Sequence, residues 1–356
     1  MTASFDWLAG RRVFLTGHTG FKGSWLTLTL SRLGALVTGY ALPPTTCPSL
    51  FTLAGVQAAC ETSHFDDILN ASRLVEAVRA ARPELIIHMA AQPLVRRSYR
   101  EPHLTWNTNV IGTVNLLEAV RQCPTARGIL VVTTDKCYEN HEWCWGYRES
   151  DPLGGADPYS ASKAAAELVV QSYRKSFFEG SASLLASARA GNVIGGGDWS
   201  EDRLIPDAAR SAAAGVPLII RNPDATRPWQ HVLESLRGYL LLSEKLLQGD
   251  RNVADAFNFG PSAVDNLPVA EVLQQLQRHW RALEWHFDPE IARKSPHEAR
   301  CLYLDSSKAR SQLNWTSVWP LNVGIEKTAV WYQRVLRDSD AARAITDQQL
   351  EEFFSQ

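Results

Sequence analysis

Short apolar runs alternate with longer amphipathic stretches through the first half of the chain. The short runs predict buried strands, and the stretches between them predict crossover helices. The predicted strands span residues 12–16, 36–40, 58–62, 85–89, 128–133, 184–188 and 256–259. The predicted helices span residues 22–33, 72–81, 103–122 and 158–178. This alternation is typical of the α/β class, here a doubly wound parallel sheet of the Rossmann type.

The pattern becomes irregular after Arg189, where a glycine-rich run and several proline-containing turns follow. We expect a smaller α/β substrate-binding domain there, and the strand at 256–259 is expected to return to the main sheet. The domains are therefore predicted to be discontinuous in sequence. The dinucleotide-binding domain would take residues 1–189 and about 231–260, and the second domain about 190–230 and 261–356.

Composition excludes several classes of protein. The 356 residues include 36 basic and 38 acidic side chains, so the formal charge of −2 predicts no general attraction to nucleic acid or to a membrane. The chain has no secretory signal pattern and no apolar run long enough to span a bilayer, which predicts a cytoplasmic protein. Its six cysteines lack zinc-site spacing, so no metal site is expected.

A glycine-rich turn follows the first predicted strand and opens the first predicted helix. Its glycines are Gly17, Gly20 and Gly23, with Phe21 and Lys22 between the last two. Glycines allow a backbone to approach a pyrophosphate, which the helix N-terminus then stabilises. The turn therefore predicts a dinucleotide site. The end of the second strand offers neither the acidic residue typical of NAD binding nor the arginine typical of NADP binding.

Tyr159 and Lys163 are four residues apart and would share one face of a helix. An ammonium beside a phenol favours the phenolate and would lower a pKa that is ordinarily about 10. Tyr159 could then act as a base, with the Thr134 hydroxyl holding the same substrate oxygen. This trio predicts hydride-transfer chemistry at an alcohol carbon.

Asp135 and Lys136 follow Thr134 directly and add two further proton-handling groups to the same place. Four proton-handling groups in one place suggest more than simple oxidation. Burial could raise the aspartate pKa and lower the lysine pKa. A direct ion pair between the two would oppose both shifts.

These residues resemble the extended short-chain dehydrogenase/reductase family, and within it the nucleotide-sugar 4,6-dehydratases. The resemblance covers nearly the whole chain and includes the segments 17–23, 88–92, 109–113, 195–199 and 227–232. The more familiar dTDP-glucose enzymes have Thr-Asp-Glu where this chain has Thr134-Asp135-Lys136. With lysine at this position, the tripeptide resembles that of the branch that uses CDP-D-glucose.

The resemblance implies NAD as cofactor, CDP-glucose as nucleotide-sugar substrate, and a 4-keto-6-deoxy product used in deoxysugar and O-antigen-type polysaccharide biosynthesis. It implies a homodimer through a four-helix bundle formed by the helices at 103–122 and 158–178, and a tetramer stays open. The implied catalytic residues are Thr134, Asp135, Lys136, Tyr159 and Lys163, with Asp135 as the acid and Lys136 as the base of the water elimination. The implied cofactor contacts are Gly17, Gly20, Phe21, Lys22, Gly23, Asp67, Ile68, Ala90, Ala91, Asn109, Tyr159 and Lys163. The implied substrate contacts are Gln92, Arg96, Asn192 and Arg227.

Two other classes of function share part of this pattern. A nucleotide-sugar 4-epimerase or 4-reductase would also need Thr134, Tyr159 and Lys163, but it has no use for an acid/base pair such as Asp135 and Lys136. A dinucleotide sensor without catalysis would have no need of the tyrosine and lysine. Arg227 could also pack on Trp229, and Arg96 could simply face water.

Overall fold

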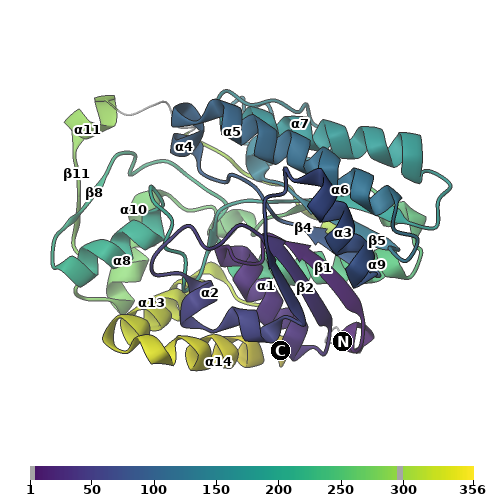
Figure 1. Ribbon diagram of the computed structural model, residues 1–356. Helices are drawn as coiled ribbons and strands as arrows, with labels where there is room; N and C mark the ends of the chain where they lie inside the picture. The colour runs from purple at the N-terminus through teal and green to yellow at the C-terminus, as the bar shows by residue number, and fades with distance from the viewer. Residues whose placement is uncertain (1–4, 295–299) are drawn as a thin grey trace.

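A seven-stranded parallel sheet forms the centre of the protein (Figure 1). The computed structural model describes residues 5–294 and 300–356. The strand order is β10-β6-β5-β4-β1-β2-β3. The strands are β1 (Arg12–Thr16), β2 (Leu36–Ala41), β3 (Thr62–Phe65), β4 (Leu85–His88), β5 (Gly128–Val132), β6 (Leu184–Ala190) and β10 (Ala256–Phe259). This order confirms the doubly wound sheet and the return of the strand at 256–259 beside β6.

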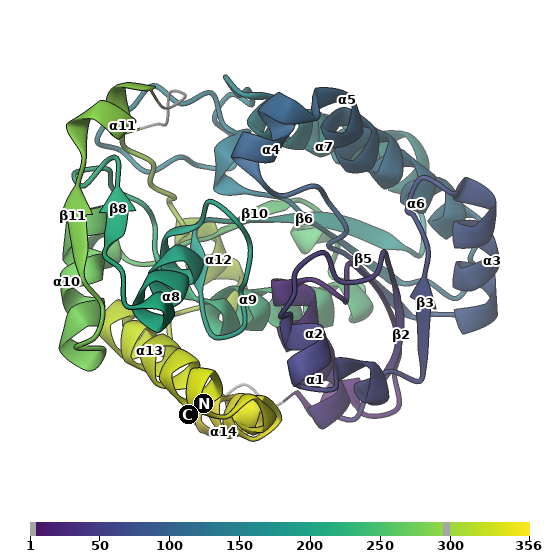
Figure 2. The same ribbon diagram turned by 60° about the vertical axis from the view of Figure 1, so that its left-hand side comes forward.

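Helices cover both faces of the sheet (Figures 1 and 2). One face carries α1 (Phe21–Arg32) and α9 (Val232–Leu247), and the other carries α3 (Ala71–Ala81), α6 (Gly112–Arg121) and α7 (Pro158–Tyr173). Side chains alternate between the two cores, as a strand requires: Val13 and Leu15 face the first, and Phe14 faces the second. Burial on both faces explains why these strands read as continuous apolar runs.

The predicted third strand is wrong in position. Residues 58–62 were expected to be extended, whereas Val56–Ala59 forms a 3₁₀ turn and β3 begins at Thr62. β3 lies at the edge of the sheet, and its residues Thr62, Ser63, His64 and Phe65 are half-buried or exposed. An edge strand of this composition lacks the apolar signal that identified its neighbours.

Two predicted helices are confirmed with an added π turn. The helix expected at 103–122 comprises α5 (Pro102–Trp106), a π turn at Asn107–Ile111 and α6. The helix expected at 158–178 comprises α7 and a π turn at Arg174–Phe178. The short helix α4 (Val95–Arg100) precedes α5.

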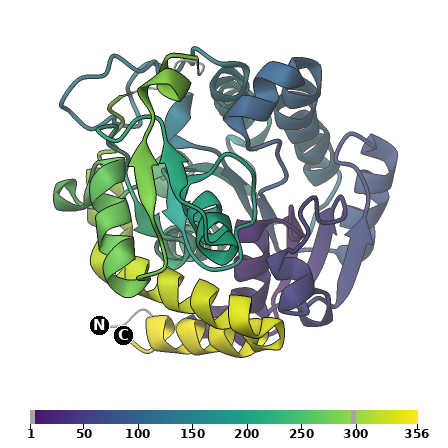
Figure 3. The same cartoon turned by 90° about the vertical axis from the view of Figure 1, so that its left-hand side faces the viewer.

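Smaller elements from the second half of the chain, drawn in green and yellow, lie beside the purple and blue elements of the first half (Figure 3). Two parallel pairs occur there, β7 (Val193–Ile194) with β9 (Gln230–His231) and β8 (Leu218–Ile220) with β11 (Trp285–Phe287). The accompanying helices are α8 (Leu204–Ala214), α10 (Val269–His279), α11 (Pro289–Lys294), α12 (Ser307–Leu313), α13 (Leu321–Arg337) and α14 (Ala342–Phe354). The helix α2 (Leu50–Leu53) follows β2. Among the described residues, no helix is both long enough and apolar enough to cross a membrane.

Candidate active site

The glycine-rich turn connects β1 to α1 at the carboxyl edge of the sheet. Gly17 has a positive φ of 78°, and a Cβ there would lie 2.7 Å from the Ala90 nitrogen. A Cβ on Gly23 would lie 2.0 Å from the Gly17 oxygen. Gly20 is the N-cap of α1 and offers no side chain to the amides of the first turn. A turn that only glycine can form, opening onto an uncapped helix N-terminus, fits an anion such as pyrophosphate.

The segment after β4 packs against this turn. Met89 and Ala90 both donate their backbone N–H groups to the Thr16 hydroxyl at 3.1 Å. Ala91 follows as a half-buried residue. The expected cofactor segment therefore lies beside Gly17, where a dinucleotide would cross the sheet.

Asp67 and Ile68 lie just beyond the end of β3, as expected for residues at the far end of a dinucleotide site. The Tyr40 hydroxyl donates to the Asp67 carbonyl at 3.1 Å, and the Asp67 carboxylate accepts the Leu69 N–H at 2.9 Å. Ile68 is buried against Gly112 of α6. These contacts fix the loop that follows the edge strand.

Protein groups hold the side chains of Gln92 and Asn109, and their expected ligand contacts stay predictions. The Gln92 amide nitrogen donates to the Thr105 hydroxyl and to the Leu94 carbonyl, and its oxygen accepts the Leu94 N–H at 2.7 Å. Asn109 bonds the Gln92 backbone through both amide atoms and the Ser162 hydroxyl at 2.8 Å. Both side chains are buried. They join the loop after β4 to α7.

Thr134 caps the 3₁₀ turn Asp135–Cys137 that follows β5. Its hydroxyl accepts the Lys136 backbone N–H at 3.3 Å and donates to the Asp135 carboxylate at 2.9 Å. It also lies close enough to the Tyr159 side chain to act on the pKa of that phenol. The structure therefore brings together the threonine, the aspartate and the tyrosine that the sequence placed in one site.

Tyr159 and Lys163 lie on the first two turns of α7, which begins with Pro158 after the cap Asp157. Both are nearly fully buried. Burial raises the Tyr159 pKa to about 12, although the Thr134 hydrogen bond and nearby Arg203 oppose it. This differs from the lowered pKa that the lysine spacing predicts, because desolvation of the phenolate outweighs the nearby donors. Burial also lowers the Lys163 pKa to about 8.

Asp135 is 1% exposed, and within the described residues its Oδ2 atom has no hydrogen-bond partner. Burial raises its pKa, although the cation of Lys136, the Thr134 hydrogen bond and Arg227 act in the other direction. Lys136 is half-buried beside it. The Asp135 carboxyl is thus held toward its protonated form, which is the form a general acid needs.

Lys22 lies beside the candidate catalytic residues. Its ammonium donates to the Tyr239 hydroxyl of α9 at 2.8 Å. Burial lowers the Lys22 pKa to about 7, and the cations of Arg203 and Lys163 lower it further, while Asp135 raises it. The lysine therefore lies among the catalytic groups.

Arg203 and Tyr239 are functional candidates that the sequence reading missed. Arg203 pairs with Asp198 at 2.9 Å and acts on the pKa of Tyr159. It precedes α8, in the part of the chain where the hydrophobic pattern is least regular. Tyr239 lies on the mostly apolar helix α9, and the sequence gives no sign of its hydrogen bond with Lys22. The one local sequence feature at Arg203 is the run Asp-Arg-Leu-Ile-Pro at 202–206, where an apolar helix begins.

The expected substrate residues lie around this cluster with different contacts. Arg227 is buried, donates to the carbonyls of Thr226 and Arg300, and lowers the Asp135 pKa. Arg96 forms an ion pair with Asp202 at 3.0 Å, so it does not simply face water. The half-buried Asn192 accepts the Gln230 N–H through its carbonyl at 3.1 Å. Among the described residues, no cluster of His, Cys, Asp and Glu side chains could hold a metal ion.

Comparison of the chain with protein families shows to which family it belongs. The family described as GDP-mannose 4,6 dehydratase matches residues 14–328. The chain belongs to this family. Its fold is thus that of a nucleotide-sugar dehydratase family, as the sequence resemblance indicated.

Individual relatives agree with this membership. The CDP-glucose 4,6-dehydratase of Salmonella typhimurium strain LT2 is 47% identical over 93% of this chain and 93% of its own length. The dTDP-glucose 4,6-dehydratase of Streptomyces venezuelae, solved with NAD bound, has a TM-score of 0.73 at 23% identity, covering 91% of this chain and 97% of that one. The UDP-glucose 4-epimerase of Thermotoga maritima has a TM-score of 0.79 at 21% identity, covering 91% and 99%. The two solved structures support the fold.

Proposed function

We propose that this protein converts CDP-D-glucose to CDP-4-keto-6-deoxy-D-glucose and water, with bound NAD. One observation carries the proposal: the 47% identity to a CDP-glucose 4,6-dehydratase extends over 93% of both chains. The buried Thr134-Asp135 segment beside Tyr159 and Lys163 supports it, because a simple dehydrogenase or epimerase has no use for an added acid at this point.

The turn from Gly17 to Gly23 fits the pyrophosphate of NAD, because its glycines leave backbone amides uncovered at the N-terminus of α1. When bound, NAD would accept hydride from C4 of the sugar and later return it to C6. Because the hydride is returned, the cofactor is regenerated within each turnover. We therefore expect tight binding and partial co-purification.

In the oxidation step, Tyr159 would take the proton of the 4-hydroxyl, and Thr134 would hydrogen-bond the same oxygen. The effect of Thr134 on the Tyr159 pKa, which requires the two side chains to lie close together, supports this division of roles. Lys163 would bind the nicotinamide ribose and stabilise the phenolate. The resulting 4-ketone acidifies the C5 hydrogen, so oxidation must precede elimination.

In the elimination step, Asp135 would protonate the departing 6-hydroxyl and Lys136 would take the C5 proton. The raised pKa of buried Asp135 favours the acid role. Hydride return to C6 then requires a proton at C5, which Lys136 can give back. Lys136 is then back in its starting state, and the proton that Tyr159 took from the 4-hydroxyl replaces the one that Asp135 gave to the departing water, which restores both of these side chains.

Substrate specificity provides the direct test. We would incubate the purified protein and NAD with CDP-, dTDP-, GDP- or UDP-glucose and follow the 4-keto-6-deoxy product by NMR. CDP-glucose is expected to give product at the highest kcat/KM. Turnover of dTDP-glucose without turnover of CDP-glucose would overturn the assignment.

Lys136→Ala separates the oxidation from the elimination. We expect this variant to reduce bound NAD on mixing with CDP-glucose but to release product at least about a hundredfold more slowly, because a lost general base costs 10²–10⁴ in rate. Stopped-flow absorbance at 340 nm would detect the accumulated NADH. Lys175→Ala, at an exposed position, serves as the control. A Lys136→Ala protein that failed to reduce NAD would place Lys136 in binding or in the first step.

The substrate-binding assignments extend this proposal. Arg227 is the candidate for the pyrophosphate because a guanidinium presents forked donors, and the half-buried Arg96 and Asn192 are the further candidates for substrate contacts. The smaller elements of residues 190–230 and 261–356 would form the nucleotide-sugar domain. A homodimer through α5, α6 and α7 is proposed for the assembly.

A further inference from the structure

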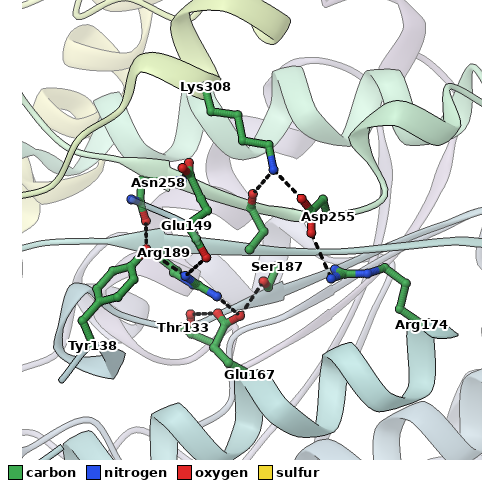
Figure 4. Close-up of polar contacts among 11 residues, drawn as sticks. Thr133, Tyr138, Glu149, Glu167, Arg174, Ser187, Arg189, Asp255, Asn258 and Lys308 are labelled. Atoms are coloured by element: carbon green, nitrogen blue, oxygen red, sulfur yellow. Dashed lines mark hydrogen bonds and ion pairs between the residues drawn. The ribbon is translucent and has the colours of Figure 1, made fainter. Parts of the chain in front are cut away.

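Glu167 and Arg189 form an ion pair at the centre of the protein that the proposed reaction does not use (Figure 4). The Arg189 guanidinium donates to the Glu167 carboxylate at 2.8 Å. Their side chains are 3% and 4% exposed. Despite burial, the guanidinium and three hydrogen bonds lower the Glu167 pKa, so the carboxylate is charged. A buried pair of this kind is weak support for stability in itself, since apolar residues of similar volume often serve as well.

The contacts of the pair reach both ends of the catalytic segment. Glu167 accepts hydrogen bonds from the hydroxyls of Thr133 and Ser187. Thr133 immediately precedes Thr134. Arg189 donates to the Tyr138 hydroxyl at 2.7 Å, and Tyr138 follows the 3₁₀ turn that contains Asp135 and Lys136. The pair thus holds the residues on either side of Thr134-Asp135-Lys136.

The same network extends to the last strand of the sheet. The Tyr138 hydroxyl donates to the Asn258 side chain of β10 at 2.7 Å. The Asn258 backbone N–H donates to the Glu149 carboxylate at 2.8 Å. Figure 4 shows the Arg189 guanidinium between the Tyr138 hydroxyl and the Glu167 carboxylate. Four segments far apart in sequence are therefore fixed around one guanidinium.

Glu167 also acts electrostatically on the catalytic lysine. It lies one helical turn beyond Lys163 on α7, on the same face. Burial lowers the Lys163 pKa, and the Glu167 charge opposes this effect. Because the low dielectric of the interior strengthens such interactions, a neutral residue at 167 would leave the Lys163 ammonium less stable.

We propose that Glu167 and Arg189 are positioning residues that clamp the Thr134-Asp135-Lys136 segment onto α7, and that the Glu167 charge keeps Lys163 protonated for the hydride step. The second part rests on the proposed function of Lys163. Neither residue is required to touch the substrate or the cofactor.

The test uses variants that separate charge from packing. Glu167→Gln combined with Arg189→Met removes both charges at nearly unchanged volume and leaves no lone buried ion. Glu167→Asp keeps the charge while shortening the reach to Thr133. The pair Lys327 and Glu352, which joins α13 to α14, gives the matched control Lys327→Met with Glu352→Gln.

We expect the alkaline limb of the rate of NAD reduction by CDP-glucose to move about one pH unit lower in the Glu167→Gln/Arg189→Met protein. The sign follows from Lys163: without the carboxylate its pKa falls, so the ammonium is lost at a lower pH. Glu167→Asp should keep the limb of the original protein even where its rate is reduced. The control pair should change neither limb.

A thermal-stability cycle tests the same coupling without turnover. At pH 7, Lys163→Met should raise the melting temperature more in the Glu167→Gln/Arg189→Met background than in the original protein, because the uncompensated ammonium is costlier there. Equal effects in both backgrounds, or a melting temperature lowered with an unmoved alkaline limb, would overturn the proposal and leave a purely structural pair. Absence of any NAD reduction in the original protein would count against the proposed function, while the stability cycle would still decide this inference.

Discussion

Lys22 illustrates at the scale of one residue how a binding site opposes folding. Its ammonium is close enough to Lys163 and Arg203 for both to lower its pKa, and a neutral phenol accepts its hydrogen bond. A site that concentrates cations can bind a dianionic pyrophosphate, but the empty protein contains their mutual repulsion. We therefore expect Lys22 to reduce stability while serving ligand binding.

Lys22→Met tests this cost through its pH dependence. The Lys22 pKa is about 7 in the folded protein and 10.5 in the unfolded chain, so the unfolded state binds more protons between these values. The destabilisation by Lys22 is therefore at its maximum below pH 7, and it decreases as the pH rises toward 10.5. The variant should melt at a higher temperature than the original protein at pH 6, and the difference should shrink by pH 10.

Tyr239→Phe provides the companion measurement, because it keeps the ammonium and removes its acceptor. We expect this variant to melt below the original protein at pH 6. A Lys22→Met protein with the same melting difference at pH 6 and pH 10 would show that the lysine is not desolvated.

At this scale the sequence predicted which residues lie together in the candidate site better than it predicted the contacts that each of them makes. Thr134, Asp135, Tyr159 and Lys163 lie together as expected, because a strand end and a helix start are local features. Gln92 and Asn109 are expected at ligands by family position, but no pattern reveals that the Asn109 side-chain amide bonds the Gln92 backbone. The proximity of Arg203 to Tyr159 depends on a chain path that no periodicity encodes.

At the scale of an element, the glycines in the turn between β1 and α1 differ in how much space each has for a side chain. A Cβ on Gly23 would lie 2.0 Å from the Gly17 oxygen, and backbone cannot move aside as a side chain can. A Cβ on Gly20 would lie 3.5 Å from the same oxygen, an ordinary contact. The spacing of the glycines in the sequence does not distinguish the crowded position from the open one.

Gly23→Ala is accordingly expected to destabilise the protein by about 1–3 kcal/mol, the usual cost of overpacking. Gly20→Ala should stay within about 1 kcal/mol of the original protein, since only the weak N-cap preference changes. Urea unfolding monitored by tryptophan fluorescence measures both. Equal destabilisation by the two substitutions would contradict the steric distinction.

Elements were predicted well where burial is two-sided and poorly where it is not. β1, β4 and β5 are covered on both faces and appear in the sequence as apolar runs. β3 has neighbours on one edge only, and its polar residues give no such run. The division into two domains depends on how segments on both sides of β10 pack together, and it stays a prediction.

At the scale of the whole molecule, large apolar side chains are exposed along adjacent helices. Trp106 on α5 is 41% exposed, Ile111 in the following π turn 47%, and Leu168 on α7 54%. α5, the π turn and α7 pack side by side (Figure 1). Apolar side chains gathered on neighbouring helices indicate a contact surface, and its position agrees with the proposed four-helix dimer interface.

Leu168→Glu tests whether this surface joins two copies of the chain. If the helices pair, the substitution buries an uncompensated carboxylate at the interface. We expect the dimer dissociation constant to rise about a hundredfold, equivalent to about 3 kcal/mol. Sedimentation velocity over a micromolar dilution series measures the change. Leu336→Glu, at a 39% exposed leucine of α13, is the control and should leave assembly unchanged. An original protein that sediments as a monomer at micromolar concentration would refute the dimer, and equal disruption by both substitutions would place the interface elsewhere.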